Sequence, residues 1–149
     1  MEYALIGHSA GGQLLSRVAA FTPTGASRIV IANPSTWVFP TLQVSAPFGL
    51  GGVYPDVQAQ AQLRRYLAQP ITVLLGQADT GAEELDQSPG AMAQGRTRYE
   101  RGLNVIRQAR MLSASRGWPL NWRLVEVPGA GHSAGTMFRS QQALSALQP

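Results

Sequence analysis

Hydrophobic positions along the chain fall into short continuous runs separated by longer amphipathic stretches, a pattern typical of strands that alternate with helices. Four apolar runs predict strands at residues 3–6, 28–32, 71–75 and 122–127. The stretches around them predict helices at residues 10–21, 57–68, about 91–115 and 134–147. Because strand, helix and strand at this spacing form right-handed parallel crossovers, we expect an α/β fold. The first run reads as a buried parallel strand.

The connection between the second strand and the next helix is unusually long and rich in aromatic residues. Residues 33–56 contain four of the ten prolines, together with Trp37, Phe39, Phe48 and Tyr54. Such a stretch exceeds an ordinary connection in a compact domain. It is either a cap over an active site or an irregular loop held on the core by its aromatic residues. We treat residues 33–68 as a cap-like insertion within a single domain that spans residues 1–149.

The first apolar run ends in Gly7-His8-Ser9-Ala10-Gly11, which matches the G-x-S-x-G pattern of a nucleophile elbow. In that motif the serine occupies a strained turn between a strand and a helix, and the flanking glycines let the backbone close tightly. The pattern therefore predicts Ser9 as a nucleophile. The alternative is a plain turn between a strand and a helix that carries a solvated serine.

Composition narrows the chemistry that the chain can perform. The absence of lysine excludes a Walker A lysine, and the absence of cysteine excludes disulfides, thiolate zinc sites and a cysteine nucleophile. Only two histidines are present, which argues against a histidine-rich metal site. We therefore expect no cofactor and no metal. No run of eighteen apolar residues predicts a membrane span, and no signal-peptide pattern is visible.

The basic residues are all arginines, 12 in number, and they give a formal net charge of +4. They are scattered along the chain rather than concentrated in one block. Those near the third predicted helix form either a phosphate-binding stripe or a solvated helix face. They are Arg96, Arg98, Arg101, Arg107 and Arg110. The absence of interleaved aromatic residues and of a nucleic-acid motif favours the solvated face, so we expect no nucleic-acid partner.

A serine nucleophile needs a base that takes its proton and an acid that holds the base in one tautomer. His132 follows the last predicted strand in a glycine-rich loop and is the candidate base, whereas His8 is expected to point away from Ser9. Asp79 lies just past the third strand and is the candidate acid, because ligands of parallel sheets collect at the carboxyl ends of strands. The competing carboxylates are expected to be solvated or to cap the next helix. They are Glu83, Glu84 and Asp86.

Several stretches together resemble the α/β-hydrolase superfamily, and in particular a microbial branch with esterase-like and polyester-depolymerase-like members. They lie at residues 7–17, 31–35, 74–80, 94–96 and 127–133. The resemblance implies a serine hydrolase that cleaves carboxylic esters through an acyl-enzyme, with a triad of Ser9, His132 and Asp79. The backbone N–H of Ala10 would be one oxyanion-hole donor. A peptidase of the same fold and a non-catalytic fragment or binding module remain alternatives.

The resemblance covers only the second half of the superfamily fold. In that fold several strands and the first oxyanion-hole loop precede the elbow, whereas here Met1 lies eight residues before Ser9. We expect a partial α/β-hydrolase fold with strand order 1-2-3-4, an exposed elbow strand at one margin, and no second oxyanion donor, since neither Gln13 nor Ser35 replaces it. The 149-residue chain is expected to dimerise or aggregate through that edge and to hydrolyse esters negligibly, until upstream residues are added.

Overall fold

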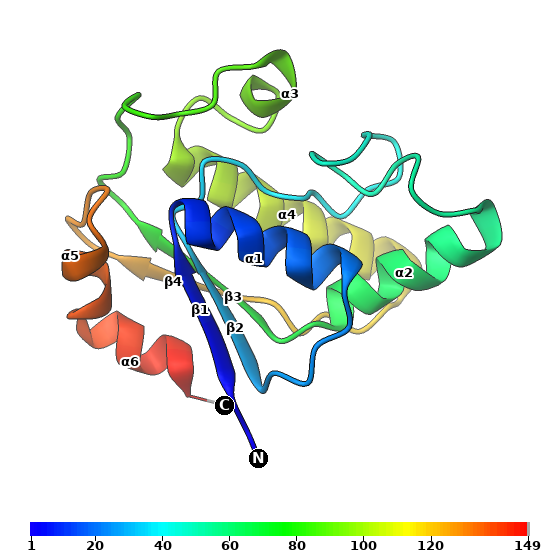
Figure 1. Ribbon diagram of the computed structural model, residues 1–149, viewed down its shortest axis with the longest axis horizontal. Coiled ribbons are helices and arrows are strands. Elements are labelled where there is room, and N and C mark those ends of the chain that lie inside the picture. Colours follow the sequence, from blue (N-terminus) through cyan, green and yellow to red (C-terminus); the bar gives the residue numbers. More distant parts are fainter. Residues whose placement is uncertain (149) are drawn as a thin grey trace.

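The structure, a computed structural model, describes residues 1–148 and contains one parallel sheet with helices on both faces (Figure 1). The strands are β1 (Ala4–His8), β2 (Arg28–Ala32), β3 (Ile71–Gly76) and β4 (Arg123–Val127). The helices are α1 (Ala10–Phe21), α2 (Asp56–Ala68), α3 (Pro89–Met92), α4 (Arg98–Arg116), α5 (Ala134–Phe138) and α6 (Gln141–Leu147). The strands pair in parallel in the order β1-β2-β3-β4. The predicted α/β fold, its strand order and the position of the first strand at one margin are confirmed.

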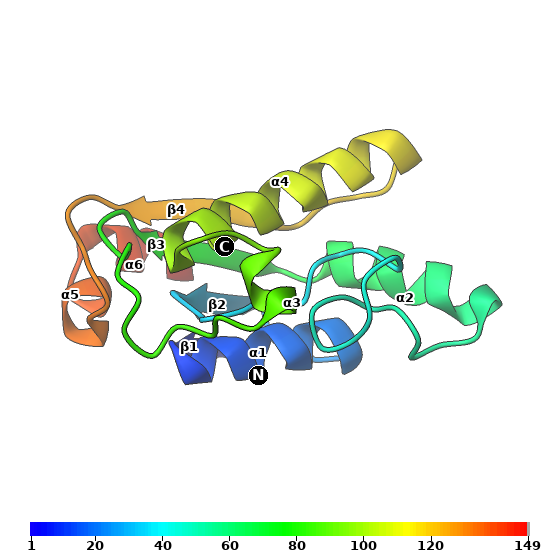
Figure 2. The same ribbon diagram turned by 90° about the horizontal axis from the view of Figure 1, so that it is seen from above.

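The sheet separates two apolar layers because successive side chains of a strand point to opposite faces. Ile29 and Ile31 of β2 belong to the larger core, which α1, α2 and α4 cover. Val30 and Ala32 belong to the smaller core on the side of α5 and α6. Figure 1 shows α5 and α6 on the opposite side of the strands from α1 and α4, and Figure 2 shows the four strands side by side in the order β1-β2-β3-β4. All residues of β3 are buried, as expected for a strand covered on both faces.

Two predicted helices are each divided in the structure. The stretch expected to be helical from residue 91 to 115 forms α3 and α4, with Gly95 at φ 151° between them. Thr97 begins α4, because its side chain accepts a hydrogen bond from the Glu100 N–H. The stretch from 134 to 147 forms α5 and α6, and the Ser140 hydroxyl caps the latter by accepting from the Ala143 N–H. In both cases a capping residue begins a new helix inside an amphipathic stretch.

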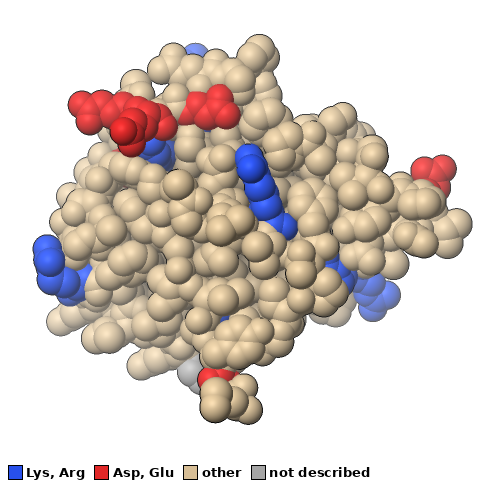
Figure 3. Space-filling model, viewed as in Figure 1, with Lys and Arg blue, Asp and Glu red and all other residues tan. Residues whose placement is uncertain are grey.

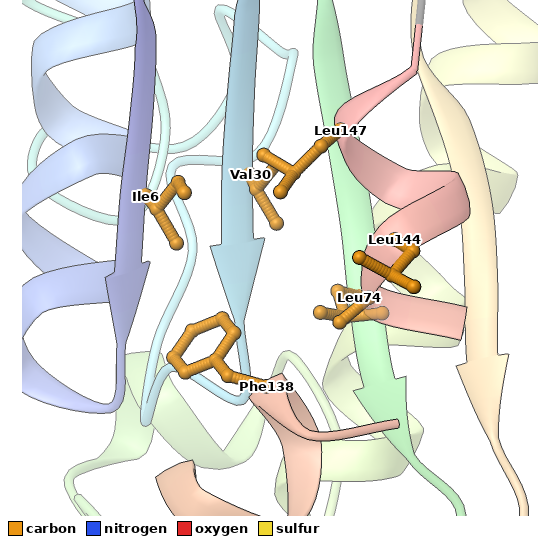
Figure 4. A pocket seen from close by; sticks show the side chains of 7 residues that line it. Ile6, Val30, Leu74, Phe138, Leu144 and Leu147 are labelled. Atoms are coloured by element: carbon orange, nitrogen blue, oxygen red, sulfur yellow. The ribbon is translucent and has the colours of Figure 1, made fainter. Parts of the chain in front are cut away.

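Strand β1 is parallel and lies exposed at one margin of the sheet, as predicted, whereas the burial that its apolar run alone predicts is wrong. Tyr3 is 46% exposed and Ile6 is 48% exposed, because within residues 1–148 β1 pairs with β2 alone. An apolar groove of about 260 Å³ lies on the α6 side of the sheet (Figure 4). Its walls come from three strands and the last two helices, and they are Ile6, Val30, Leu74, Phe138, Ala143, Leu144 and Leu147. Association through this margin stays a prediction.

The long connection after β2 contributes to the core rather than lying loosely on it. Trp37, Val38 and Leu50 are each 1% exposed and belong to the larger core. The Gln94 side chain accepts from the Trp37 N–H at 2.9 Å and donates to the Trp37 carbonyl at 2.6 Å. This part of the connection is therefore held on the core by its aromatic and apolar residues. A cap-like role for residues 33–68 stays a prediction.

Two arginines of α4 lie inside the protein, so the predicted solvated helix face is wrong at these positions. Arg98 is 2% exposed and Arg101 is fully buried. The Arg101 guanidinium donates to three backbone carbonyls, at Gly95 (2.9 Å), Ser35 (2.6 Å) and Asp86 (2.9 Å). A guanidinium has five N–H groups, so one buried arginine can tie several loop segments together. Arg101 joins the connection after β2 and the loop after β3 to the start of α4.

The charged side chains that Figure 3 shows are sparse, and the arginines on this face lie apart from one another. The helices within residues 1–148 are all too short or too polar to cross a lipid bilayer. The predicted absence of a nucleic-acid partner stays a prediction.

Candidate active site

Ser9 occupies a strained turn between β1 and α1. Its backbone dihedral angles are φ 57° and ψ −119°, a conformation that non-glycine residues rarely adopt. The Ser9 N–H donates to the Ala32 carbonyl at 2.9 Å, and the Ser9 carbonyl accepts from the Gln13 N–H at 2.9 Å. The turn is thus tied to β2 on one side and to the first turn of α1 on the other. A strained backbone conformation that surrounding hydrogen bonds hold in place is characteristic of functional sites.

The glycines around this turn differ in what they contribute. A Cβ at Gly7 would lie 2.5 Å from the backbone carbonyl of Gly11, and a Cβ at Gly12 would lie 2.9 Å from the carbonyl oxygen of Ala32. A Cβ at Gly11 would meet open space. The expectation that glycine is needed on both sides of the motif is therefore correct for Gly7 and wrong for Gly11. The second crowded position is Gly12, where α1 approaches β2.

Replacement of Gly7 by alanine is expected to destabilise the fold at the upper end of the range of about 1–3 kcal/mol that overpacking costs, because the clashing atoms are backbone. Gly11→Ala is the matched control, and it should leave stability unchanged or raise it by up to about 1 kcal/mol. Urea unfolding of the two variants measures the difference. Equal midpoints for both variants would contradict the steric account.

The structure brings Ser9, His132 and Asp79 together in one hydrogen-bonded series. His132 Nε2 lies 2.9 Å from Ser9 Oγ, and His132 Nδ1 lies 2.7 Å from Asp79 Oδ2. A carboxylate only accepts hydrogen bonds, so with Asp79 as a carboxylate the Nδ1 atom carries a proton, and in the neutral imidazole Nε2 can then accept from the serine hydroxyl. The three residues come from the ends of β1, β3 and β4, which meet at one edge of the sheet.

Backbone contacts between the loops after β3 and β4 set the distance from Asp79 to His132. The Ala78 N–H donates to the Ala130 carbonyl at 2.9 Å. A Cβ at Gly76 would lie 2.5 Å from that same carbonyl oxygen, so glycine permits this close approach. The Asp79 carbonyl accepts from the Tyr99 N–H at 3.2 Å, which fixes the loop to α4. The position of the carboxylate thus depends on both β4 and α4.

Arg98 lies beside Asp79 and was not identified from the sequence. Arg98 Nη1 is 3.8 Å from Asp79 Oδ1, and both side chains are almost fully buried. Arg98 Nη2 donates to the Glu83 carbonyl at 2.8 Å. The two side chains form a buried salt bridge, in which each supplies the opposite charge that burial of the other requires. No local signal separates Arg98 from its exposed neighbours, because its burial depends on a loop that folds across the start of α4.

Arg98→Met is expected to destabilise the protein by about 3 kcal/mol, since loss of one partner leaves the buried Asp79 carboxylate without its cation. Arg107→Met is the matched control, because Arg107 lies on the exposed side of the same helix. Its effect should stay within about 0.5 kcal/mol. Thermal and urea unfolding at neutral pH provide the measurement, and equal stability of the two variants would show that Arg98 makes no net contribution.

The competing carboxylates lie elsewhere in the loop after β3. Glu83 and Glu84 are exposed, as predicted. Asp86 Oδ1 accepts from the Ser88 N–H at 2.9 Å, and this backbone hydrogen bond lowers the pKa of Asp86. Asp79, His132, Glu83, Glu84 and Arg98 line a polar depression of about 860 Å³. Within residues 1–148, no group of three histidine, cysteine, aspartate or glutamate residues is arranged to hold a metal.

Ala10 is the first residue of α1. Its N–H is one of the four at a helix start that have no partner inside the helix, so it is available to a developing negative charge. The Ser35 hydroxyl accepts from the Asp86 N–H at 2.8 Å and is engaged there. The role of Ala10 as an oxyanion donor stays a prediction, and a second donor is unassigned.

His8 and Asn33 also belong to this edge of the sheet, although sequence reasoning gave neither a role. The His8 ring packs against the His132 ring, with centroids 4.9 Å apart. Asn33 follows β2 directly, is fully buried, and has φ 46°. Its side-chain amide contacts both His8 and the end of β3. An asparagine directly after a buried strand, where it can adopt a left-handed conformation, is the signal that could have found it.

Comparison with known proteins identifies hydrolases of similar structure. No protein-family model matches the chain, and no curated protein matches it significantly. A poly(3-hydroxybutyrate) depolymerase from Bordetella parapertussis superposes over 97% of this chain with TM-score 0.88 and 34% sequence identity. A poly(aspartic acid) hydrolase from Sphingomonas sp. KT-1 superposes over 96% with TM-score 0.85 and 34% identity. The chain spans 48% and 54% of their respective lengths. It therefore carries a partial α/β-hydrolase fold, about half the length of these solved enzymes.

Proposed function

We propose that the protein is a serine hydrolase that cleaves carboxylic esters through an acyl-enzyme intermediate. The observation that carries this proposal is the hydrogen-bonded series from Ser9 through His132 to Asp79, with distances of 2.9 and 2.7 Å. Ser9 is the nucleophile, His132 is the general base, and Asp79 holds the base in the Nδ1–H tautomer. The strained turn at Ser9 and the likeness to two named hydrolases support the same assignment.

In the acylation half of the reaction, Ser9 Oγ forms a bond to the ester carbonyl carbon while His132 Nε2 takes the hydroxyl proton. The carbonyl oxygen becomes an oxyanion, to which the Ala10 N–H donates. When the intermediate collapses, the bond to the alcohol oxygen breaks and His132 returns the proton to the leaving alcohol. In the second half, His132 deprotonates a water, which attacks the acyl-Ser9 ester and releases a carboxylic acid. Ser9 and neutral His132 are regenerated.

Oxyanion stabilisation sets the expected rate of the 149-residue chain. Each well-placed donor contributes roughly 3 kcal/mol to lowering the barrier. One donor, the Ala10 N–H, is assigned here. A protein in which the Ala10 N–H is the single donor is therefore expected to turn over about 100-fold or more slowly than one with a complete oxyanion hole.

Amide hydrolysis is a second candidate function, and one of the comparisons favours it. The two similar enzymes are named for different polymers: poly(3-hydroxybutyrate) is a polyester, whereas poly(aspartic acid) is a polyamide. The sequence identity to both is the same, 34%, so identity does not separate the two bond types. A p-nitrophenyl ester and a p-nitroanilide with the same acyl group distinguish them directly.

The acyl-enzyme is tested by rapid mixing with p-nitrophenyl esters. The test compares the 149-residue chain with a version extended by any residues encoded in frame before Met1. In the extended version we expect a burst of p-nitrophenol that approaches one equivalent per protein, followed by slower turnover, because acylation precedes deacylation. Absence of both the burst and the turnover in the extended protein would reject the proposed function.

A further inference from the structure

The orientation of the Asn33 side chain follows from its contacts. Asn33 Oδ1 lies 2.9 Å from the Gly76 backbone N–H, which can only donate, so the amide oxygen must face it. The Nδ2 group then faces His8 Nε2 at a distance of 3.3 Å. Because an amide NH₂ only donates hydrogen bonds, His8 Nε2 has to be the acceptor.

This hydrogen bond fixes the protonation state of His8. If Nε2 accepts, the ring proton lies on Nδ1 and the imidazole is neutral, because a protonated ring would direct a second N–H at the Asn33 NH₂ group. Burial and the neighbouring His132 lower the pKa of His8, with a smaller opposing effect from Asp79 and a further lowering by Arg98. Electrostatics and hydrogen bonding therefore both favour the neutral form.

The neutral ring of His8 lies directly against His132. The two rings are tilted by 34° at a centroid distance of 4.9 Å, and the Phe138 ring meets His8 edge-on at 6.1 Å. His132 itself is 28% exposed and lies in the loop between β4 and α5. Its two hydrogen bonds leave the ring able to tilt out of plane. A flat neighbour opposes that tilt.

We propose that His8, held as the neutral Nδ1–H tautomer by Asn33, is a positioning residue that keeps the His132 ring aligned between Ser9 and Asp79. The inference rests on the proposed function for its effect on rate, whereas its structural part can be measured without turnover. It also gives Asn33 a role, since its side chain joins the residue before the nucleophile to the strand that carries the acid.

Nitrogen-resolved NMR of the histidine rings tests the role of Asn33. In the unmodified chain we expect His8 Nδ1 to be protonated and Nε2 to be unprotonated, and this state should persist below pH 6.5, the ordinary histidine pKa. Asn33→Asp should reverse it, because a carboxylate accepts from Nε2–H and stabilises the charged ring. His8 would then titrate at higher pH than in the unmodified chain. A proton on Nε2 before the substitution, or an unchanged titration after it, would overturn the proposal.

Substitutions of His8 test its effect on His132. His8→Ala should lower the rate constant of Ser9 phosphonylation by a fluorophosphonate by up to about 100-fold, as expected for a misplaced catalytic group. His8→Phe restores a flat ring and should recover most of this rate, whereas His8→Leu fills the space without planarity and should recover less. The low-field NMR resonance of the His132 Nδ1 proton should broaden in His8→Ala and persist in His8→Phe.

The two readouts separate the possible failures. If Ser9 does not react even in the protein extended by any residues encoded before Met1, the proposed function fails, and the His132 resonance still decides whether His8 positions the ring. If Ser9 reacts equally fast in His8→Ala and in the unmodified chain, with an unchanged His132 resonance, the positioning role is wrong. Circular dichroism establishes that each variant is folded, and His8→Leu replaces His8→Ala if the smaller side chain prevents folding.

Discussion

Replacement of Ser9 by alanine is expected to abolish covalent labelling by a fluorophosphonate and to lower ester turnover by about 10⁶-fold relative to the same protein with Ser9. The reason is geometric: Ser9 Oγ is the hydroxyl that the structure places 2.9 Å from an imidazole nitrogen whose other nitrogen meets a buried carboxylate. Without that hydroxyl, no bond to the acyl group can form. Peptide mass spectrometry of the labelled protein identifies the modified residue.

The matched control for this prediction is Ser133→Ala, because Ser133 is next to His132 in the sequence but caps α5 with its hydroxyl. This variant should still be labelled at Ser9. Labelling that survives Ser9→Ala, or that moves to another serine, would remove Ser9 from the proposed mechanism while leaving the description of the fold intact.

Asp79→Asn is expected to lower kcat by about 10⁴-fold in a protein that still folds, as for the corresponding substitution in serine proteases. It should also lower stability, because the buried Arg98 loses its carboxylate. Asparagine has nearly the same shape as aspartate, but its amide can donate a hydrogen bond to His132 Nδ1. The imidazole proton then moves to Nε2. Because Nε2 now carries a proton, it can no longer accept the proton of Ser9. Steady-state kinetics together with urea unfolding separate the loss of activity from a loss of stability.

Glu83→Gln and Glu84→Gln are the controls for the acid, since both glutamates are exposed in the loop that carries Asp79. Each should change kcat by less than about twofold, because water and salt screen the effect of a solvent-exposed charge on the reacting groups. A large loss of activity at either glutamate, combined with little effect at Asp79, would require the acid to be reassigned.

The sequence predicts those elements whose ends carry their own signals. Helix α1 and strand β2 have the predicted bounds, because the glycine-rich turn and Asn33-Pro34 delimit them locally. The sequence does not predict the breaks before α4 and α6, because the amphipathic pattern continues across Thr97 and Ser140, although each residue is a favourable N-cap. Local patterns thus locate elements better than they locate breaks inside a periodic stretch.

Burial depends on segments that are distant in sequence, and the sequence predicts it less well. The apolar run of β1 taken alone predicts a buried strand, and the 48% exposure of Ile6 is expected only from the strand order, because strand pairing decides burial. The sequence predicts that Arg98 and Arg101 are solvated, yet both are buried and their guanidinium groups donate hydrogen bonds to loop carbonyls. The contact between His8 and Asn33 joins residues that are 25 positions apart, and the hydrophobic pattern of the sequence does not predict it.

Because β1 lies at the margin of the sheet, the segment that carries Ser9 is locally less stable than the segments that carry Asp79 and His132. Ser9 follows a half-exposed strand that pairs with β2 alone within residues 1–148, whereas Asp79 follows β3, which is buried along its whole length. Fraying of β1 would therefore carry the hydroxyl away from His132 while Asp79 and His132 stay hydrogen-bonded. Amide protons of β1 would exchange with solvent long before those of β3. The fraction of molecules in which Ser9 can attack a substrate would then depend on how often β1 detaches from β2. A polypeptide that pairs with the outer edge of β1 would raise this fraction without contacting the reacting atoms.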